Sequence, residues 1–581
     1  MYSNLNPMIA KVYSAIPQGY NGHLVEVEGD ISRSLPSFNI VGMANKTISE
    51  ARERVRAAIV NSGFRFPDKR VTINLAPAEL AKDGTHLDVP IALAILVLSQ
   101  QLLPSDLVGR IFVGELSLNG QTKANRGIIN IIETAVAAGF QEIYVPNANL
   151  SQATLVPQAT VIGFDNLKSL FLHLKGAKPL PVYKNHQPNT NFSTQNPSTP
   201  VRPHVVKNTY SRVKTKSSIP NATDPQPSRP VVKITQTDNN IIELSNCPTH
   251  DPDVVKNKET DETNVEYLLD HIQGQNFAKR ALTIAIAGNH NLLLSGPPGS
   301  GKTMLAKVAR NLLPPPSPNE QIEIAKLHNL VATSSISTCR PFRSPHHTAS
   351  AAAIIGGGPH ILPGEISLAH RGILFLDELP EFPRPVLEAL RQPLEDKTIT
   401  ISRTSQHATY PADFMFIGTM NPCPCGYLND PDHPCNCQPH QILRYQKRLS
   451  GPILDRIDLI VHVQKLTSQD LMLNVVKNNK TGKEHLNCQT KIFAARHLQF
   501  QRYAPLSKYN SALSPPEIQQ YLHLTPSAQK LLQTATDKLK LSARGHFKTI
   551  KVAQTIADLN NSNTINTEHI AEALTFREPC L

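Results

Sequence analysis

A glycine-rich segment at residues 296–303 has the composition and spacing of a phosphate-binding loop. It reads GPPGSGKT and fits the pattern G-x-x-x-x-G-K-[ST]. An apolar run precedes it and residues 304–313 are typical of a helix, so backbone N–H groups would surround an anion. Lys302 would reach the β- and γ-phosphates, and the Thr303 hydroxyl would bind Mg²⁺. The predicted nucleotide-binding residues of this loop are Gly296, Pro297, Pro298, Gly299, Ser300, Gly301, Lys302 and Thr303.

Two carboxylates follow a second apolar run, at residues 372–378 (GILFLDE). This pattern predicts a buried parallel strand with its acids at the carboxyl edge, where open α/β sheets bind ligands. Asp377 would hold Mg²⁺ through water, and Glu378 would act as general base on an attacking water. A further strand at residues 416–420 would end at Asn421, which could orient that water and sense the γ-phosphate.

Four of the eight cysteines fall within fifteen residues, directly after Asn421. Their spacing is C-x-C-x₉-C-x-C, and the ligand set is Cys423, Cys425, Cys435 and Cys437. Four thiolates suit a structural, tetrahedral Zn²⁺ site, and the turn-rich segment between the pairs could bring them together. Reduced or redox-active thiols are the alternative, and His433 or His440 could replace one thiolate.

The length of 581 residues predicts about two to four domains, and the fold class expected is multidomain α/β. Residues 1–175 indicate an α+β domain, residues 265–466 a nucleotide-binding core with an insert at 423–437, and residues 467–581 a helical lid. Residues 176–264 predict a linker. Its part up to residue 233 holds ten prolines and nine Lys or Arg against one acid, a composition typical of disorder.

Most of the formal net charge of +12 lies in the first part of that linker, since the nine basic residues and one acid of residues 176–233 account for +8 of it. The remaining blocks are only mildly basic, so net charge alone is poor evidence for a folded DNA-binding face. No apolar run reaches the roughly 20 residues that span a bilayer. The N-terminus lacks a charged region followed by an apolar core. We therefore expect a cytoplasmic protein without a membrane partner, in which clustered cysteines indicate metal rather than disulfides.

These motifs together resemble the AAA+ ATPases of the magnesium-chelatase-like branch, and within it the YifB family. The resemblance also rests on residues 270–275 (DHIQGQ), 340–348 (RPFRSPHHT), 363–370 (PGEISLAH) and 377–382 (DELPEF). It extends over the three ordered blocks but not the linker, which is longer than is usual in the family. It implies ATP and Mg²⁺ as cofactors, an AAA+ core with a helical lid, and core inserts at residues 319–363 that face the pore of a ring.

The resemblance also gives candidate roles to two arginines. Arg456, flanked by Asp455 and Asp458, would enter the neighbouring subunit's site and neutralise charge on the γ-phosphate. An arginine beside acids at a helix end is otherwise usually a salt-bridged surface group. Arg544 is the best candidate for a lid arginine that contacts nucleotide. Lys548 and Lys551 are alternatives on the same helix, and the whole stretch could instead be a solvated basic face.

The first block resembles the Lon-type serine protease domain without its catalytic pair. In that family a K-D-G-P-S stretch carries the nucleophile, whereas residues 82–86 here read KDGTH and place His86 at its position. The partner lysine is replaced by Ile129. Because a Ser–Lys dyad needs a hydroxyl and a base, we predict an inactive domain that serves assembly or DNA contact.

The resemblance implies a hexameric, DNA-stimulated ATP hydrolase. It would be a branch-migration helicase that binds single-stranded or branched DNA and promotes recombination during natural transformation. The alternatives are a protein-remodelling or chelatase-like AAA+ ATPase that does not act on DNA, and a nucleotide-dependent assembly scaffold. Stimulation of ATP turnover by DNA separates the first two.

Overall fold

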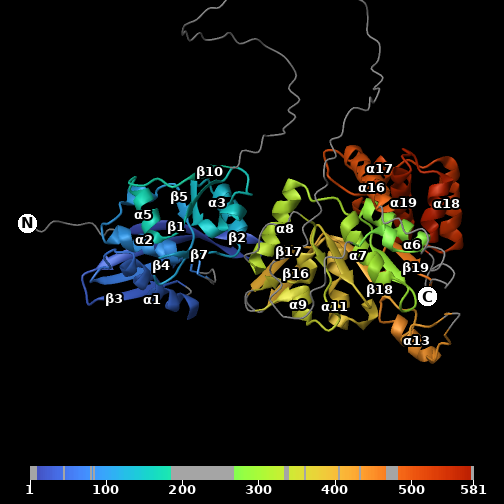
Figure 1. Cartoon of the computed structure of the whole chain (residues 1–581), viewed down its shortest axis with the longest axis horizontal. Coiled ribbons are helices and arrows are strands. Elements are labelled where there is room, and N and C mark those ends of the chain that lie inside the picture. The colour runs from blue at the N-terminus through green and yellow to red at the C-terminus, as the bar shows by residue number, and fades with distance from the viewer. Residues whose placement is uncertain are drawn as a thin grey trace, which may run out of the picture. The chain divides into compact units, whose positions relative to one another are not determined.

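The computed structural model of the chain describes residues 9–42, 46–78, 82, 85–184, 267–332, 339–358, 361–403, 406–428, 430, 433–465 and 482–577 (Figure 1). Most of the predicted linker, from residue 185 onward, lies outside these residues, as do Asp83 and Gly84. Among the helices within these ranges, none combines the length and apolar character that a bilayer crossing requires.

The first domain is built on an eight-stranded mixed sheet with the strand order β10-β9-β8-β5-β1-β2-β4-β3. Its strands are β1 (Ala10–Gln18), β2 (Asn21–Ser32), β3 (Ser37–Val41), β4 (Arg70–Ala76), β5 (Arg110–Phe112), β8 (Glu142–Pro146), β9 (Thr160–Phe164) and β10 (Val182–Lys184), with a small hairpin of β6 (Glu115–Leu116) and β7 (Thr122–Lys123). Its helices are α1 (Lys46–Asn61), α2 (Asp88–Leu98), α3 (Ile128–Ala137), α4 (Leu150–Ala153) and α5 (Leu167–Leu174).

Helix α2 lies in the core of this domain, and every one of its residues is buried. An apolar helix without a polar face must be covered on all sides, and α2 packs on β1 and β2. Strand β10 pairs antiparallel with β9 from Val182 to Lys184. The first domain therefore extends to Lys184, beyond the boundary near residue 175 that composition predicted, because a short strand inside a proline-rich stretch gives little sequence signal.

The second domain contains a five-stranded sheet in which all neighbouring strands are parallel, in the order β12-β15-β18-β11-β19. The strands are β11 (Leu292–Ser295), β12 (Phe342–Arg343), β15 (Ile373–Leu376), β18 (Met415–Met420) and β19 (Leu459–His462). Strands β11, β15 and β18 are buried at every position, as expected for a parallel sheet covered on both faces. This confirms the predicted α/β class with a parallel sheet core.

Helices and two hairpins surround this sheet. The helices are α6 (Asn276–Gly288), α7 (Lys302–Leu312), α8 (Pro318–Val331), α9 (Ala351–Ile355), α10 (Glu365–Leu368), α11 (Arg384–Ala389), α12 (Arg391–Asp396), α13 (Pro439–Gln446) and α14 (Gly451–Leu454). The hairpins pair β13 (Gly356–Gly357) with β14 (Leu362–Pro363) and β16 (Thr398–Arg403) with β17 (Gln406–Pro411).

The C-terminal block contains the helices α16 (Lys483–Arg502), α17 (Pro515–Tyr521), α18 (Pro526–Lys538), α19 (Ala543–Leu559) and α20 (Thr567–Thr575). It shares one hydrophobic core with α6, α7 and the parallel sheet. Asp458, just before β19, fixes this junction through an ion pair with Lys548 of α19 at 2.9 Å, and His290 lies 3.6 Å away. Burial alone would raise the pKa of Asp458, but Lys548 and His290 hold it well below its usual range.

Candidate active site

The predicted polar residues meet at the carboxyl edge of the parallel sheet. In the register of the sheet, Ser295 of β11 pairs with Met420 of β18, and Leu376 of β15 pairs with Gly418 of β18. The phosphate-binding loop, Asp377 and Asn421 directly follow these three strand ends. The central strands therefore deliver all three motifs to one edge, as short apolar runs with polar endings predict.

The glycines of the loop have positions that a side chain could not easily take. Gly299 and Gly301 have φ values of +75° and +88°, in the left-handed region that favours glycine. A Cβ on Gly296 would lie 2.2 Å from the carbonyl oxygen of Val463. The loop can therefore turn tightly from β11 into α7, as the predicted phosphate-binding loop requires.

Lys302 begins α7 and holds its ammonium inside the loop. Its Nζ donates to the carbonyl oxygens of Gly296 at 2.7 Å and Pro297 at 2.8 Å, and to Oδ1 of Asn421 at 3.2 Å. Burial lowers the pKa of Lys302. These acceptors are neutral, so a phosphate oxygen that replaced one of them would make a stronger, charge-assisted bond.

Asp377 lies between two threonine hydroxyls. Thr303 Oγ1 donates to Oδ2 of Asp377 at 3.0 Å, and Thr419 Oγ1 donates to Oδ1. Thr419 Oγ1 also accepts a hydrogen bond from the backbone N–H of Glu378 at 2.9 Å. Mg²⁺ prefers carboxylate and other hard oxygen ligands, so the adjacent hydroxyl of Thr303 and carboxylate of Asp377 fit this ion. Sequence reasoning missed Thr419, although a polar residue inside the buried β18 was a signal for it.

Glu378 presents a half-exposed carboxylate beside His347. Its backbone has a φ of +51°, and its side chain is 52% exposed. Nδ1 of His347 lies 3.8 Å from Oε2 of Glu378, and the His347 ring packs edge-on against Phe382. The stretch RPFRSPHHT contains His347, but only the fold brings it to Glu378.

Arg456 and Arg544 meet at a third residue, Glu395 of α12. Arg456 Nη2 forms an ion pair with Oε2 of Glu395, and Arg544 Nη2 pairs with Oε1 at 2.5 Å. The two arginines are separated by many residues in sequence, and no local pattern indicated their shared partner. The alternatives to Arg544 have other partners. Lys548 is the partner of Asp458, and Lys551 Nζ donates to the carbonyl oxygen of Ser511 at 2.9 Å.

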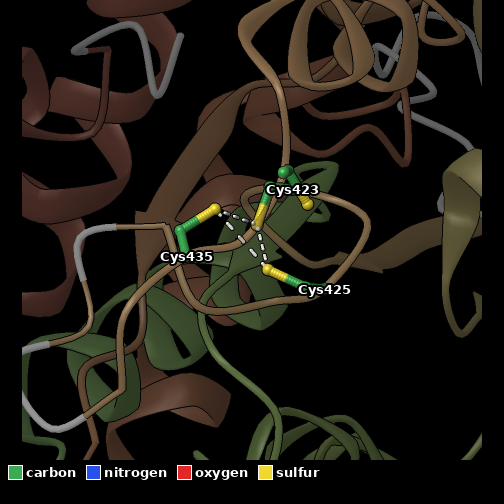
Figure 2. A group of neighbouring side chains, drawn as sticks. Cys423, Cys425 and Cys435 are labelled. Atoms are coloured by element: carbon green, nitrogen blue, oxygen red, sulfur yellow. Dashed lines mark hydrogen bonds between the residues drawn. The ribbon is translucent and has the colours of Figure 1, made fainter.

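The four predicted cysteine thiols converge on one point. Figure 2 shows Cys423, Cys425 and Cys435 turned toward one another, with Sγ–Sγ distances of 3.3, 3.5 and 3.7 Å. With Cys437, all four sulfurs lie within 4.8 Å of one another. Four sulfurs about 2.3 Å from a Zn²⁺ ion lie about 3.8 Å apart at tetrahedral angles, so the thiols fit this ion.

The thiols of the cysteine cluster differ in their pKa values. A hydrogen bond from the backbone of Tyr427 lowers the pKa of the Cys425 thiol to about 6, whereas burial raises the pKa of Cys423 to about 12. His433, a predicted alternative ligand, instead packs against the ring of Tyr427. Among the described residues, one group of three or more possible metal ligands lies close enough together to hold an ion, and its members are the four cysteines.

His86 and Ile129, which stand where Lon-type proteases would carry their catalytic pair, are both buried in the first domain. His86 Nε2 donates to the carbonyl oxygen of Arg126 at 2.8 Å, and burial lowers the pKa of this imidazole. Ile129 lies on α3 and is fully buried. Asp88, two residues after His86, forms bonds of 2.8 and 3.1 Å with the guanidinium of Arg54. Nε2 of His86 and the carboxylate of Asp88 therefore both bind other groups of the same domain.

Comparisons with known proteins agree with this architecture. The family described as magnesium chelatase, subunit ChlI, matches residues 268–471, and its C-terminal family matches residues 483–577. The family described as subunit ChlI of Mg-chelatase matches residues 27–149 of the first domain. The chain is 37% identical over 572 residues to competence protein ComM of Haemophilus influenzae, covering 98% of this chain and 97% of that protein.

Two further relatives extend the comparison. The chain is 37% identical to the uncharacterized protein YifB of Escherichia coli, over 97% of this chain and 96% of that protein. It is 21% identical over 295 residues to DNA replication licensing factor mcm7 of Xenopus tropicalis, covering 50% of this chain and 37% of that protein.

Proposed function

The chain belongs to the family of ComM and YifB, within the magnesium-chelatase-like AAA+ proteins, and from this premise we propose that it is an ATP-driven ring motor that moves branched DNA. The observation that carries the ATPase part is the convergence of Lys302, Asp377 and Asn421 at one edge of the parallel sheet. The name of ComM as a competence protein and the distant similarity to a DNA replication factor support DNA as the substrate.

In this proposal the loop at residues 296–303 binds the phosphates of ATP through its backbone N–H groups, and Lys302 exchanges a carbonyl partner for a phosphate oxygen. Thr303 and Asp377 hold Mg²⁺, which supplies charge neutralisation at the phosphates when bound. Glu378 accepts a proton from the attacking water. Asn421, already bonded to Lys302, orients that water.

Arg456 and Arg544 act on the nucleotide once the ring, a hexamer as in the family, has formed. In the single chain Glu395 forms an ion pair with each of the two arginines. A phosphate carries more charge than one carboxylate, so a nucleotide held by a neighbouring subunit can compete for Arg456. The mutual proximity of the two arginines supports a joint role, with Arg456 reaching the neighbour and Arg544 serving as the lid arginine.

The remaining parts serve this motor. The four cysteines hold a structural Zn²⁺. The first domain has a Lon-protease-like fold without proteolytic activity, because His86 and Ile129 occupy the positions of the dyad and neither can supply a Ser–Lys pair. The protein works in the cytoplasm, without a membrane partner.

A labelled four-way DNA junction tests the proposal. Wild-type protein with ATP and Mg²⁺ should separate the junction into duplexes without cutting a strand. It should also hydrolyse ATP faster when DNA is added. Lys302→Ala should abolish both activities, whereas the matched control Lys530→Ala, which removes an exposed lysine from α18, should retain them. ATP turnover that no DNA stimulates, with junctions left intact, would reject the DNA motor and favour a protein-remodelling or chelatase-like ATPase.

A further inference from the structure

The cysteine cluster touches the phosphate-binding loop through one glycine. Gly426 closes the turn that begins at Cys423, since its N–H donates to the carbonyl oxygen of Cys423 at 2.9 Å. A Cβ on Gly426 would lie 2.6 Å from Cδ and 2.7 Å from Cγ of Pro298 in the loop. Gly426 also has a φ of +84°. Only a glycine permits both this backbone conformation and this close approach.

The same turn is fixed to the active site at its other end. Cys423 follows Asn421 by two residues, and Asn421 accepts a hydrogen bond from Lys302. The intervening carbonyl of Pro422 accepts a bond of 3.2 Å from Nε2 of Gln446 on α13. The turn at residues 423–426 therefore spans the short distance between Asn421 and Pro298, two parts of the nucleotide site.

Two of the four thiols belong to this turn. Cys423 is buried and Cys425 immediately precedes Gly426, while Cys435 and Cys437 approach from a later segment. An ion bound by all four sulfurs would tie the turn to that later segment. Release of that ion would leave the turn without this cross-link.

We propose that the metal held by the four cysteines controls the affinity of the phosphate-binding loop for ATP, through the contact between Gly426 and Pro298. This inference rests on the proposed functions of the loop and the cluster. Metal binding presses Gly426 against the loop and keeps Pro298 and Asn421 in the positions that bind nucleotide. Loss of the metal or oxidation of the thiols weakens nucleotide binding without altering any residue that touches phosphate.

The test measures metal content and nucleotide affinity separately on the full chain. Zinc is released with a thiol-reactive mercurial, followed by thiol reductant and chelator, and affinity is measured with a fluorescent ATP analogue. The metal-free protein and Cys435→Ser should bind the analogue about tenfold more weakly than wild type. Added Zn²⁺ should restore affinity in the metal-free wild type but not in Cys435→Ser.

Gly426→Ala separates the contact from the metal itself. It should keep a full complement of zinc yet bind the analogue about tenfold more weakly, because the new methyl group overlaps Pro298. The matched control is Gly139→Ala, at a glycine with a φ of +81° and no neighbour within 4 Å. This control should leave nucleotide affinity unchanged.

Different results would contradict the metal site, the ATPase activity and the coupling between them. Wild-type protein that neither contains nor takes up zinc would overturn the metal site and this inference with it. Wild-type protein that binds zinc but no ATP analogue would instead reject the proposed ATPase. Metal-free protein with an unchanged melting temperature and undiminished affinity for the analogue would overturn the coupling alone, as would full affinity in Gly426→Ala.

Discussion

The carboxyl edge of the ATPase sheet and the buried cluster around His86 in the first domain both gather polar side chains, but they use them differently. At the sheet edge, Lys302 is bonded to neutral acceptors and the carboxylate of Glu378 is half exposed. In the first domain, Asp88 is 1% exposed, and the guanidinium of Arg54 and the N–H of Leu116 bind its oxygens.

This contrast separates groups that can exchange partners from groups that cannot. A ligand can replace a carbonyl on Lys302 or a solvent molecule on Glu378 at little cost. It cannot replace the Arg54 guanidinium on Asp88 without leaving a buried charge unpaired. We therefore expect substitutions at the sheet edge to change ATP turnover and substitutions in the first-domain cluster to change stability.

The largest expected effect is that of Glu378→Gln. The amide cannot accept a proton, so kcat for ATP hydrolysis should fall by about 10²–10⁴-fold. Affinity for ATP and the melting temperature should stay close to those of wild type, because Glu378 makes few contacts within the fold. The control is Glu381→Gln, three residues on, whose carboxylate pairs with Arg448 at 2.8 Å. An equal loss of turnover in both variants would contradict the role of Glu378.

Asp88→Ala should instead lower stability and leave ATP turnover unchanged. Removal of this carboxylate leaves Arg54 and the N–H of Leu116 without their partner, at a cost of about 3 kcal/mol in the free energy of unfolding of the first domain. Urea denaturation followed by hydrogen exchange in β1, β2 and β5 measures this loss. ATP turnover per folded molecule should not change. The exposed Asp165 provides the control, Asp165→Ala.

The loss in Asp88→Ala should also depend on pH. Burial raises the pKa of Asp88 to about 6, more than Arg54 lowers it. Because the folded-state pKa lies above the unfolded value of about 3.9, the protonated group stabilises the fold at low pH. That contribution is lost as pH rises toward 6. The difference in unfolding free energy between wild type and Asp88→Ala should therefore shrink from pH 4 to pH 6, and a growing difference would contradict the dominance of burial.

The sheet edge was largely predictable from sequence because each part has a local signal. The segments at 292–295, 373–376 and 415–420 are short apolar runs, and each is followed by the residues that carry the chemistry. Parallel strands bring such endings together without further information. The cysteine cluster was predictable for a similar reason, since its four ligands lie within fifteen residues.

The partners of these residues could not be predicted in this way. The pairing of Glu378 with His347, of Arg456 and Arg544 with Glu395, and of Gly426 with Pro298 each joins distant segments. Such contacts depend on how helices and loops pack around the sheet, and no periodicity encodes them. Lys548 is a similar case, because its spacing suggested a solvated basic residue, yet its side chain is only 15% exposed and pairs with Asp458.

The smallest effect is expected for a substitution of Glu395, a partly exposed residue that is neither free of partners nor fixed in a buried ion pair. Glu395 is 44% exposed, and it holds both Arg456 and Arg544 in the single chain. Exposed ion pairs contribute up to about 1 kcal/mol each, so Glu395→Gln should barely change the melting temperature. It should raise ATP turnover several-fold at protein concentrations where rings are only partly assembled, because Arg456 no longer has to leave a carboxylate to reach a neighbour's nucleotide. Glu388→Gln, which removes the partner of Arg391 on the adjoining helix, is the control. A fall in turnover at all protein concentrations would show that Glu395 positions the two arginines for catalysis and does not keep them from the nucleotide. Glu395 would then resemble the fixed ion pair of Asp88 and Arg54 in the first domain and not the exchangeable groups of the sheet edge.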